Sequence, residues 1–369
     1  MKIALVHDWL TNFGGSERCV QAFSELYPTS PLYTSLWDKK NVPQFANQEI
    51  VTSFLQKMPG SIHHHAFYLN QMPMAFERFD FSDYDVVLSS SHACAKGIIT
   101  LPKTIHICYC HTPTRYLWDF WHQYINNPSY FGLFNPLIKL FAPLAATYLR
   151  LWDRSAAERV DYFIANSRYI SERIKKYYRK PSVVIYPPVD VADFHQSDDL
   201  GDYFLLVSRL VTYKRVDLAI SAFNELGIPL KIVGDGPEYK KLRSLANSNI
   251  EFLGSVEEQE KRDLMARCQA FIFPPEEDFG ITAVEAMAAG RPVIALRRGG
   301  ALETVVEGRT GLFFDEQRSD LLCEAVRSFD NKDFNSTAIR KHAMQFDRSV
   351  FKQRIHDFIT QKYREKHTH

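Results

Sequence analysis

The chain has 369 residues, of which 46% are hydrophobic and 24% are charged, and its formal net charge is +1. This length predicts two domains, the composition is that of a soluble globular protein, and the balanced charge argues against a nucleic-acid partner. The six cysteines are scattered, and the chain shows neither a cleavable leader nor an 18-residue apolar run, so we expect a cytoplasmic protein with reduced thiols.

Strand and helix patterns alternate along the chain, which predicts parallel sheets covered by helices on both faces. In the first half we expect strands at residues 3–7, 31–35, 85–89, 104–109, 162–165 and 183–186, and helices at 16–26, 136–158 and 167–178. Pro187 and Pro188 then interrupt the pattern and indicate a linker.

A second alternating series follows the linker. We expect strands at residues 203–208, 230–233, 250–252, 270–273 and 293–295. Helices are expected up to Leu226 and at residues 238–246, 257–268, 282–289, 318–329, 336–345 and 349–362. The repeated alternation indicates a second parallel-sheet domain.

Two acids, Glu277 and Glu285, are separated by seven residues. An apolar strand ends at Pro274, and helix formers then continue from about residue 282 to Gly290. Open parallel sheets bind ligands at the carboxyl ends of their strands, and the free amides of a helix start favour anions. Two acids beside an anion site would suit hydroxyl groups, as on a sugar and a ribose. The alternative is a loop acid followed by an acid on a solvated helix face.

This segment resembles the Glu-x7-Glu signature of retaining glycosyltransferases of family 4, and motifs along nearly the whole chain agree. The resemblance implies the α/β GT-B fold, in which two Rossmann-like domains face each other across a cleft. Residues 1–188 would bind the acceptor, with a C-terminal helix in 349–369 crossing back to them. Residues 189–348 would bind the nucleotide-sugar.

The resemblance also implies roles for the residues of this segment. Glu277 would be catalytic by holding the sugar hydroxyls, and Glu285 would hold the ribose. The start of the helix would bind the donor through Phe279, Gly280, Ile281 and Thr282.

Arg209 and Lys214 lie five positions apart in the loop after the first strand of the second domain, so both can reach one anion. The alternative is a pair of solvated cations. The family uses an Arg and a Lys at the matching positions on the donor diphosphate. Gly234 lies in the next turn, where a glycine permits close backbone approach, and the resemblance implies that this loop and Val256 line the nucleotide pocket.

Gly14 and Gly15 follow the first strand of the chain, and Ser16 can cap the next helix. Such a turn is often only structural. Opposite a diphosphate site, however, the two glycines would leave room for the donor against the backbone.

His111 follows an apolar strand, where a residue of the reacting face is expected. Cys108, Cys110 and His111 lack the spacing of a zinc site, and we expect neither a metal nor a cofactor. The resemblance makes His111 catalytic. The motif that begins at His111 resembles relatives that build bacterial surface polysaccharides and are often mannosyltransferases, which makes Arg115, Trp118 and Asp119 acceptor-side candidates.

Three further motifs imitate a functional pattern or depart from the family's pattern. Asp83 and Asp85 imitate a metal-binding Asp-x-Asp motif but precede a strand, so we reject them. Leu302 replaces the proline of the family's Gly-Gly-x-Pro-Glu loop, which makes that loop less rigid. The histidines at 63–65 are expected to form a solvated cluster.

Residues 120–152 mix aromatic and aliphatic residues with Lys139, Arg150 and Arg154. The segment could lie in a membrane interface, or it could be a buried helix that follows an acceptor loop. Residues 1–190 carry 19 Lys and Arg against 15 Asp and Glu, a charge of +4, which would suit an anionic or membrane-bound acceptor.

The resemblance therefore implies transfer of a hexose from a nucleotide-sugar, UDP-glucose or GDP-mannose, to a saccharide acceptor. The acceptor would be lipid-linked, in polysaccharide biosynthesis at the inner membrane face. A sugar-nucleotide 2-epimerase and a non-catalytic nucleotide-sugar binding protein remain alternatives.

Overall fold

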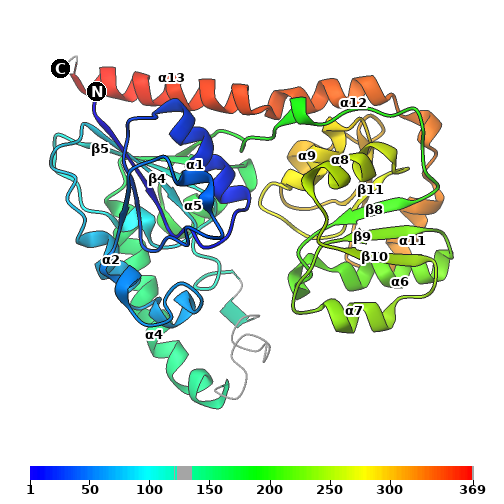
Figure 1. The fold of residues 1–369 in the computed structure, drawn as a ribbon, viewed down its shortest axis with the longest axis horizontal. Coiled ribbons are helices and arrows are strands. Elements are labelled where there is room, and N and C mark those ends of the chain that lie inside the picture. Colours follow the sequence, from blue (N-terminus) through cyan, green and yellow to red (C-terminus); the bar gives the residue numbers. More distant parts are fainter. Residues whose placement is uncertain (120, 123–134, 368–369) are drawn as a thin grey trace. The chain divides into compact units, whose positions relative to one another are not determined.

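The structure is a computed structural model that describes residues 1–119, 121–122 and 135–367. The chain divides into two compact units (Figure 1), one formed by Met1–Tyr186 with Phe351–His369 and the other by Pro187–Val350. These boundaries lie two residues from those that the sequence predicted. What each unit binds stays a prediction.

The first unit contains a seven-stranded sheet with the strand order β3-β2-β1-β4-β5-β6-β7, in which every pairing is parallel. Its strands are β1 (Ile3–His7), β2 (Leu32–Thr34), β3 (Ile50–Thr52), β4 (Val86–Ser91), β5 (Ile105–Cys110), β6 (Tyr162–Ala165) and β7 (Ser182–Val184). The sequence analysis missed β3, because three half-buried residues carry too short a pattern to be recognised.

Helices cover both faces of this sheet, as Figure 1 shows. They include α1 (Gly15–Leu26), α2 (Met72–Glu77), α4 (Asn135–Glu158), α5 (Arg168–Tyr178) and α13 (Arg348–His367). Ile3 and Leu5 of β1 belong to a buried cluster with residues of α1 and α13, whereas Ala4 and Val6 belong to a cluster with residues of α2. This alternation follows from the two-residue period of a strand and explains why β1 is apolar throughout.

The second unit contains a six-stranded sheet with the order β10-β9-β8-β11-β12-β13, again with parallel pairings. Its strands are β8 (Phe204–Val207), β9 (Leu230–Val233), β10 (Ile250–Gly254), β11 (Phe271–Phe273), β12 (Val293–Leu296) and β13 (Gly311–Phe314). Its helices include α6 (Val216–Leu226), α7 (Tyr239–Leu245), α8 (Glu258–Arg267), α9 (Ile281–Ala288), α10 (Ala301–Thr304), α11 (Ser319–Arg327) and α12 (Ser336–Ala343). The short elements β13 and α10 were not predicted.

The predicted α/β architecture of two parallel-sheet domains is confirmed. Because the strands of each sheet run in one direction, their carboxyl ends share one edge, and the candidate residues lie at these edges. Within the described part of the chain, no helix combines the length and the apolar character needed to cross a membrane.

Candidate active site

Polar side chains of the first unit gather where β1, β4 and β5 end. His7 is the last residue of β1 and lies opposite Ser90 of β4, and His111 directly follows β5. His7 and Ser90 are fully buried. The fold thus places His111, the predicted catalytic residue, beside two residues that the sequence analysis did not single out.

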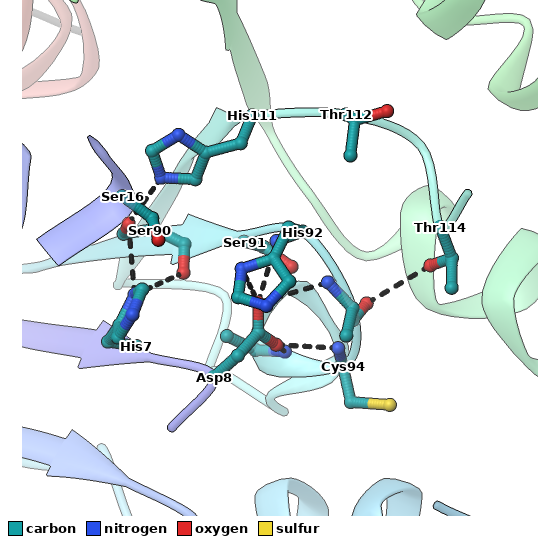
Figure 2. A network of polar contacts seen from close by, with 12 residues as sticks. His7, Asp8, Ser16, Ser90, Ser91, His92, Cys94, His111, Thr112 and Thr114 are labelled. Atoms are coloured by element: carbon teal, nitrogen blue, oxygen red, sulfur yellow. Dashed lines mark hydrogen bonds and ion pairs between the residues drawn. The ribbon is translucent and has the colours of Figure 1, made fainter. Parts of the chain in front are cut away.

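A chain of hydrogen bonds joins these three residues (Figure 2). Nε2 of His111 lies 2.8 Å from Oγ of Ser90, and Nδ1 of His7 lies 3.1 Å from the same oxygen and 3.1 Å from the Ser90 carbonyl oxygen. Burial, together with the charges of His92 and His7, lowers the pKa of His111 to about 3. His111 is therefore neutral near pH 7, with one ring nitrogen able to accept a hydrogen bond.

Glu17 connects this chain to the Gly14–Gly15 turn. Its Oε1 lies 3.3 Å from Nε2 of His7, and its Oε2 accepts hydrogen bonds from the amide of Gly14 at 2.8 Å and the hydroxyl of Ser16 at 3.0 Å. Burial raises the pKa of Glu17, but the hydrogen bond and charge of His7 outweigh burial, so the pKa is lowered. The Gly14-x-x-Glu17 spacing at the start of α1 has the form of a capping box and could have identified Glu17.

Asp8, which follows β1, holds the loop after β4. Its buried carboxylate accepts four backbone hydrogen bonds, from His92, Ala93, Cys94 and Ala95. Burial raises the pKa of Asp8, but His92, His7 and these backbone bonds lower it below the usual value. The sequence analysis missed Asp8, because the four amides belong to a loop more than 80 residues away.

The three histidines at 63–65 are not one solvated cluster. His63 and His64 are exposed, but His65 is half-buried, and its ring centroid lies 4.9 Å from that of Trp9. The prediction was wrong for His65, because tertiary contact with Trp9 covers it.

The motif that begins at His111 is anchored by a buried carboxylate on α4. Asp153 lies 2.5 Å from Nζ of the equally buried Lys96, and it accepts hydrogen bonds from Thr114 at 2.7 Å and from the indole of Trp118 at 2.8 Å. The hydroxyl of Tyr178 donates to the same carboxylate at 2.9 Å. One acid therefore ties the loop after β5 to α4 and α5.

The three acceptor-side candidates lie in this loop. Trp118 donates to Asp153 and stacks on Tyr177, and Asp119 forms an ion pair with Arg173. Arg115 lies between His111 and Trp118 in the sequence, and its side chain is half-buried. Trp118 and Asp119 thus have partners inside the protein that fix the shape of the loop.

In the second unit, the fold brings Lys214 and Glu277 into contact. Lys214 lies in the loop after β8, Glu277 lies in the loop after β11, and these two strands are neighbours. Nζ of Lys214 is 2.5 Å from Oε1 of Glu277, and both side chains are largely buried. Arg209 is exposed and has no ion pair or side-chain hydrogen bond with another described residue.

Glycines hold the loops of this edge close together. Gly234 has a φ of +131°, and a Cβ there would lie 1.9 Å from the Ser208 carbonyl oxygen. Gly300 donates its amide to the Glu277 carbonyl at 2.8 Å, and a Cβ there would lie 2.3 Å from Cα of Phe279. Because position 300 has no side chain, its amide can approach the Glu277 carbonyl and keep the Glu277 loop in place. This close approach explains the Gly-Gly motif at 299–300.

The Glu277 loop leads into α9. Gly280 precedes the helix with a φ of +91°, Phe279 is buried, and Ile281 and Thr282 form the first turn. The amides of this first turn have no partners within the helix and can bind an anion.

Glu285 lies inside α9, where it is 2% exposed. Nζ of Lys261 on α8 lies 3.3 and 3.5 Å from its two carboxylate oxygens, and 2.9 Å from Glu258. Val256, in the loop before α8, is half-buried. The sequence analysis missed Lys261, because nothing local distinguishes it from a solvated lysine of α8.

No group of three or more His, Cys, Asp or Glu side chains among the described residues could hold a metal ion. All six cysteines are unpaired and buried.

Comparison with known proteins gives matches over both units. Residues 13–193 match the model described as Glycosyltransferase Family 4, and residues 192–346 match the model described as Glycosyl transferases group 1. The chain is 28% identical over 208 residues to the D-rhamnosyltransferase WbpZ of Pseudomonas aeruginosa, and this alignment covers 52% of this chain and 53% of the relative. It is also 28% identical over 217 residues to the O-antigen chain mannosyltransferase C of Escherichia coli, and that alignment covers 54% of this chain and 57% of the relative.

Among solved structures, the Anabaena protein HepE in complex with UDP and glucose superimposes with a TM-score of 0.69 at 20% identity. That match covers 98% of this chain and 99% of the other. The alignments with these two curated relatives cover little more than half of the length of each relative. With glycosyltransferase models matching both units and with this fold, the chain belongs to the GT-B glycosyltransferases.

Proposed function

We propose that the protein is a retaining glycosyltransferase that moves a hexose from a nucleotide-sugar to a saccharide acceptor. The contact between Lys214 and Glu277 carries this proposal. Lys214 is a cation suited to a diphosphate, and Glu277 is a carboxylate suited to sugar hydroxyls. In a nucleotide-sugar these two groups are bonded to each other, so two adjacent residues could hold both. Incubation with donor and acceptor should give an α-linked product from an α-linked donor, as measured by NMR of the product. A β-linked product would contradict retention.

Charge stabilisation is the main chemistry of the second unit in this proposal. Arg209, Lys214 and the first-turn amides of α9 neutralise the departing diphosphate. Glu277 holds the sugar hydroxyls and Glu285 holds the ribose. In the first unit, His111 orients or polarises the reacting groups.

The donor is UDP-glucose or GDP-mannose. Similarity to the O-antigen chain mannosyltransferase C supports a mannose donor, whereas similarity in fold to a structure with UDP and glucose supports a glucose donor. A thermal-shift panel of nucleotide-sugars separates them, because only the bound donor raises the melting temperature.

Transfer should need no divalent metal, since basic side chains and helix amides supply the positive charge. Activity should persist in excess EDTA. Loss of activity with chelator and its return with magnesium or manganese would contradict this proposal.

The epimerase and the non-catalytic alternatives have their own outcomes. Incubation with donor alone would give an isomerised nucleotide-sugar if the protein were an epimerase. Donor binding without any product, across a panel of acceptors, would favour a binding protein.

A surface of α4 supports a lipid-linked acceptor. Leu144, Tyr148 and Leu151 lie on one face of the helix and are 72%, 56% and 70% exposed. Such an exposed apolar face is typical of an interaction surface, and we propose reversible contact with the anionic inner face of the cell membrane. The neighbouring residues 120 and 123–134 of the predicted interfacial segment lie outside the described residues.

Liposome flotation tests this contact. Binding should need anionic lipid, weaken with salt and decrease when Leu144 and Leu151 are both replaced by Glu. Thr147→Ser, on the same helix, is the matched control. Equal flotation of the double variant and the control would contradict a role for this face.

A further inference from the structure

His7 lies in the interior of the first unit between a carboxylate and a hydroxyl. Glu17 is ionised near pH 7 because its pKa is lowered, so it can only accept a hydrogen bond. Nε2 of His7, 3.3 Å from Glu17, therefore carries a proton. Nδ1 of His7 lies 3.1 Å from Oγ of Ser90, which can donate or accept, and 3.1 Å from the Ser90 carbonyl oxygen, which can accept a proton from Nδ1 once His7 is charged.

The remaining hydrogens can be placed from this starting point. When His7 is neutral, its Nδ1 has a lone pair and accepts the hydroxyl proton of Ser90. Oγ of Ser90 then accepts from Nε2 of His111, 2.8 Å away. Each hydrogen in the chain points toward Glu17, and Nδ1 of His111, which is turned away from Ser90 in Figure 2, keeps its lone pair.

We propose that Ser90, His7 and Glu17 form a proton relay behind His111, an inference that rests on the proposed transferase function. Nδ1 of His111 takes the proton of the acceptor hydroxyl, its Nε2 proton passes to Oγ of Ser90, and the Ser90 proton passes to Nδ1 of His7. The acceptor oxygen bonds to the anomeric carbon, and the electron pair of the broken bond leaves on the diphosphate. The extra proton rests on His7 and later returns to solvent by the same path.

The charges around the chain favour His7 over His111 as the place where the proton rests. His111 is half-buried beside His92 and His7, which disfavours a charge on its own ring. His7 instead has the Glu17 carboxylate at 3.3 Å and the ionised Asp8 next to it in the chain. Within the described part of the chain, the burial of His7, His92 with a ring centroid 5.9 Å away, and His111 oppose this charge.

Nitrogen NMR of labelled histidines tests the relay in the free protein, independently of transfer. His111 should carry its proton on Nε2 near pH 8. Ser90→Ala should release this constraint and populate the Nδ1–H form, whereas Ser90→Thr should preserve the wild-type signals. Ser89→Ala is the matched control, since Ser89 lies on the same strand and contacts His106 instead. An Nδ1–H form in the wild type, or an unchanged Ser90→Ala spectrum, would overturn the proposal.

Kinetics test whether the relay serves the reaction. We would measure kcat in mixtures of light and heavy water and plot it against the deuterium fraction of the solvent. The plot should be curved for the wild type and for Ser90→Thr, because several protons move together. Ser90→Ala should give a straight line and a kcat about 100-fold lower, with an unchanged KM for the donor. Should Ser90→Ala fail to fold, Glu17→Gln replaces it.

Glu17→Gln removes the carboxylate that stabilises the extra proton on His7, so kcat should fall while the KM for the donor stays unchanged. A folded Glu17→Gln variant with the wild-type kcat would overturn the relay. Complete absence of transfer by the wild type, with the expected NMR result, would instead contradict the proposed function alone.

Discussion

Nζ of Lys214 lies 2.5 Å from Oε1 of Glu277, although 63 positions separate the two residues in the chain. The sequence suggested a diphosphate contact for Lys214 and a sugar contact for Glu277. Their proximity means that these two contacts would be made within a few ångströms of each other.

Arg209→Ala should weaken binding of the nucleoside diphosphate. A charge-assisted contact to phosphate contributes about 1.5–3 kcal/mol, so the dissociation constant should rise about ten-fold or more. Titration calorimetry measures the change. Lys241→Ala is the control, because Lys241 is exposed on α7 and pairs with Glu238, the N-cap residue of the same helix. Equal affinity of Arg209→Ala and the wild type would exclude Arg209 from the phosphate site.

Glu277→Ala and Glu285→Ala should have different kinetic effects. Loss of Glu277 should mainly lower kcat, because sugar positioning matters most in the transition state. Loss of Glu285 should mainly raise the KM for the donor. If both variants lost only donor affinity to the same extent, this division of roles would be wrong.

Glu285→Ala should also lower thermal stability, unlike Glu277→Ala. Glu285 is 2% exposed, and its removal leaves Lys261 buried with Glu258 as its remaining ion-pair partner among those described. Differential scanning calorimetry of both variants measures the difference. A melting temperature lower for Glu277→Ala than for Glu285→Ala would contradict a structural contribution of the Lys261 pair.

Asp153→Ala should strongly destabilise the first unit. It removes the partner of the buried Lys96 and the acceptor of Thr114, Trp118 and Tyr178. Breaking a buried ion pair typically costs about 3–5 kcal/mol. Urea denaturation measures the free energy of unfolding, and replacement of Lys96 and Asp153 together, by Met and Leu, should restore part of it. Additive effects of the two replacements would argue against coupling.

Folding stability should fall as the pH falls from about 6.5 toward 3. Burial lowers the pKa of His106 to about 3, so the unfolded chain takes up a proton on this histidine in a pH range where the folded protein does not. Above the pKa that His106 has in the unfolded chain, neither state binds this proton and the folded state keeps its full stability. Below it, stability is lost as the pH falls. Denaturation at several pH values measures the slope, at most about 1.4 kcal/mol per pH unit from this group. His106→Asn should reduce the slope, and an unchanged slope would contradict this origin.

Much of the fold could be predicted from the sequence. The strands β1, β6 and β9 have the predicted bounds, and α1, α5 and α9 begin within one residue of their predicted starts. These elements carry strong local signals: apolar runs, helix periodicity, and glycines or prolines at their ends. Because parallel strands share one edge, the same reading also placed His111 and Glu277 after strand ends. It missed β3 and β13, because an edge strand of three or four residues carries little periodicity.

The contacts within the candidate site were decided only by the tertiary structure. His7 meets Ser90 because β1 pairs with β4, and Lys214 meets Glu277 because β8 lies beside β11. Local periodicity reports which residues of a strand are buried but not which strands become neighbours. For the same reason the sequence indicated that Glu285 and Trp118 were candidates, but not that Lys261 and Asp153 are their partners. The first pair depends on α8 packing beside α9 and the second on the loop after β5 lying against α4, and both are decided by burial and charge over the whole unit.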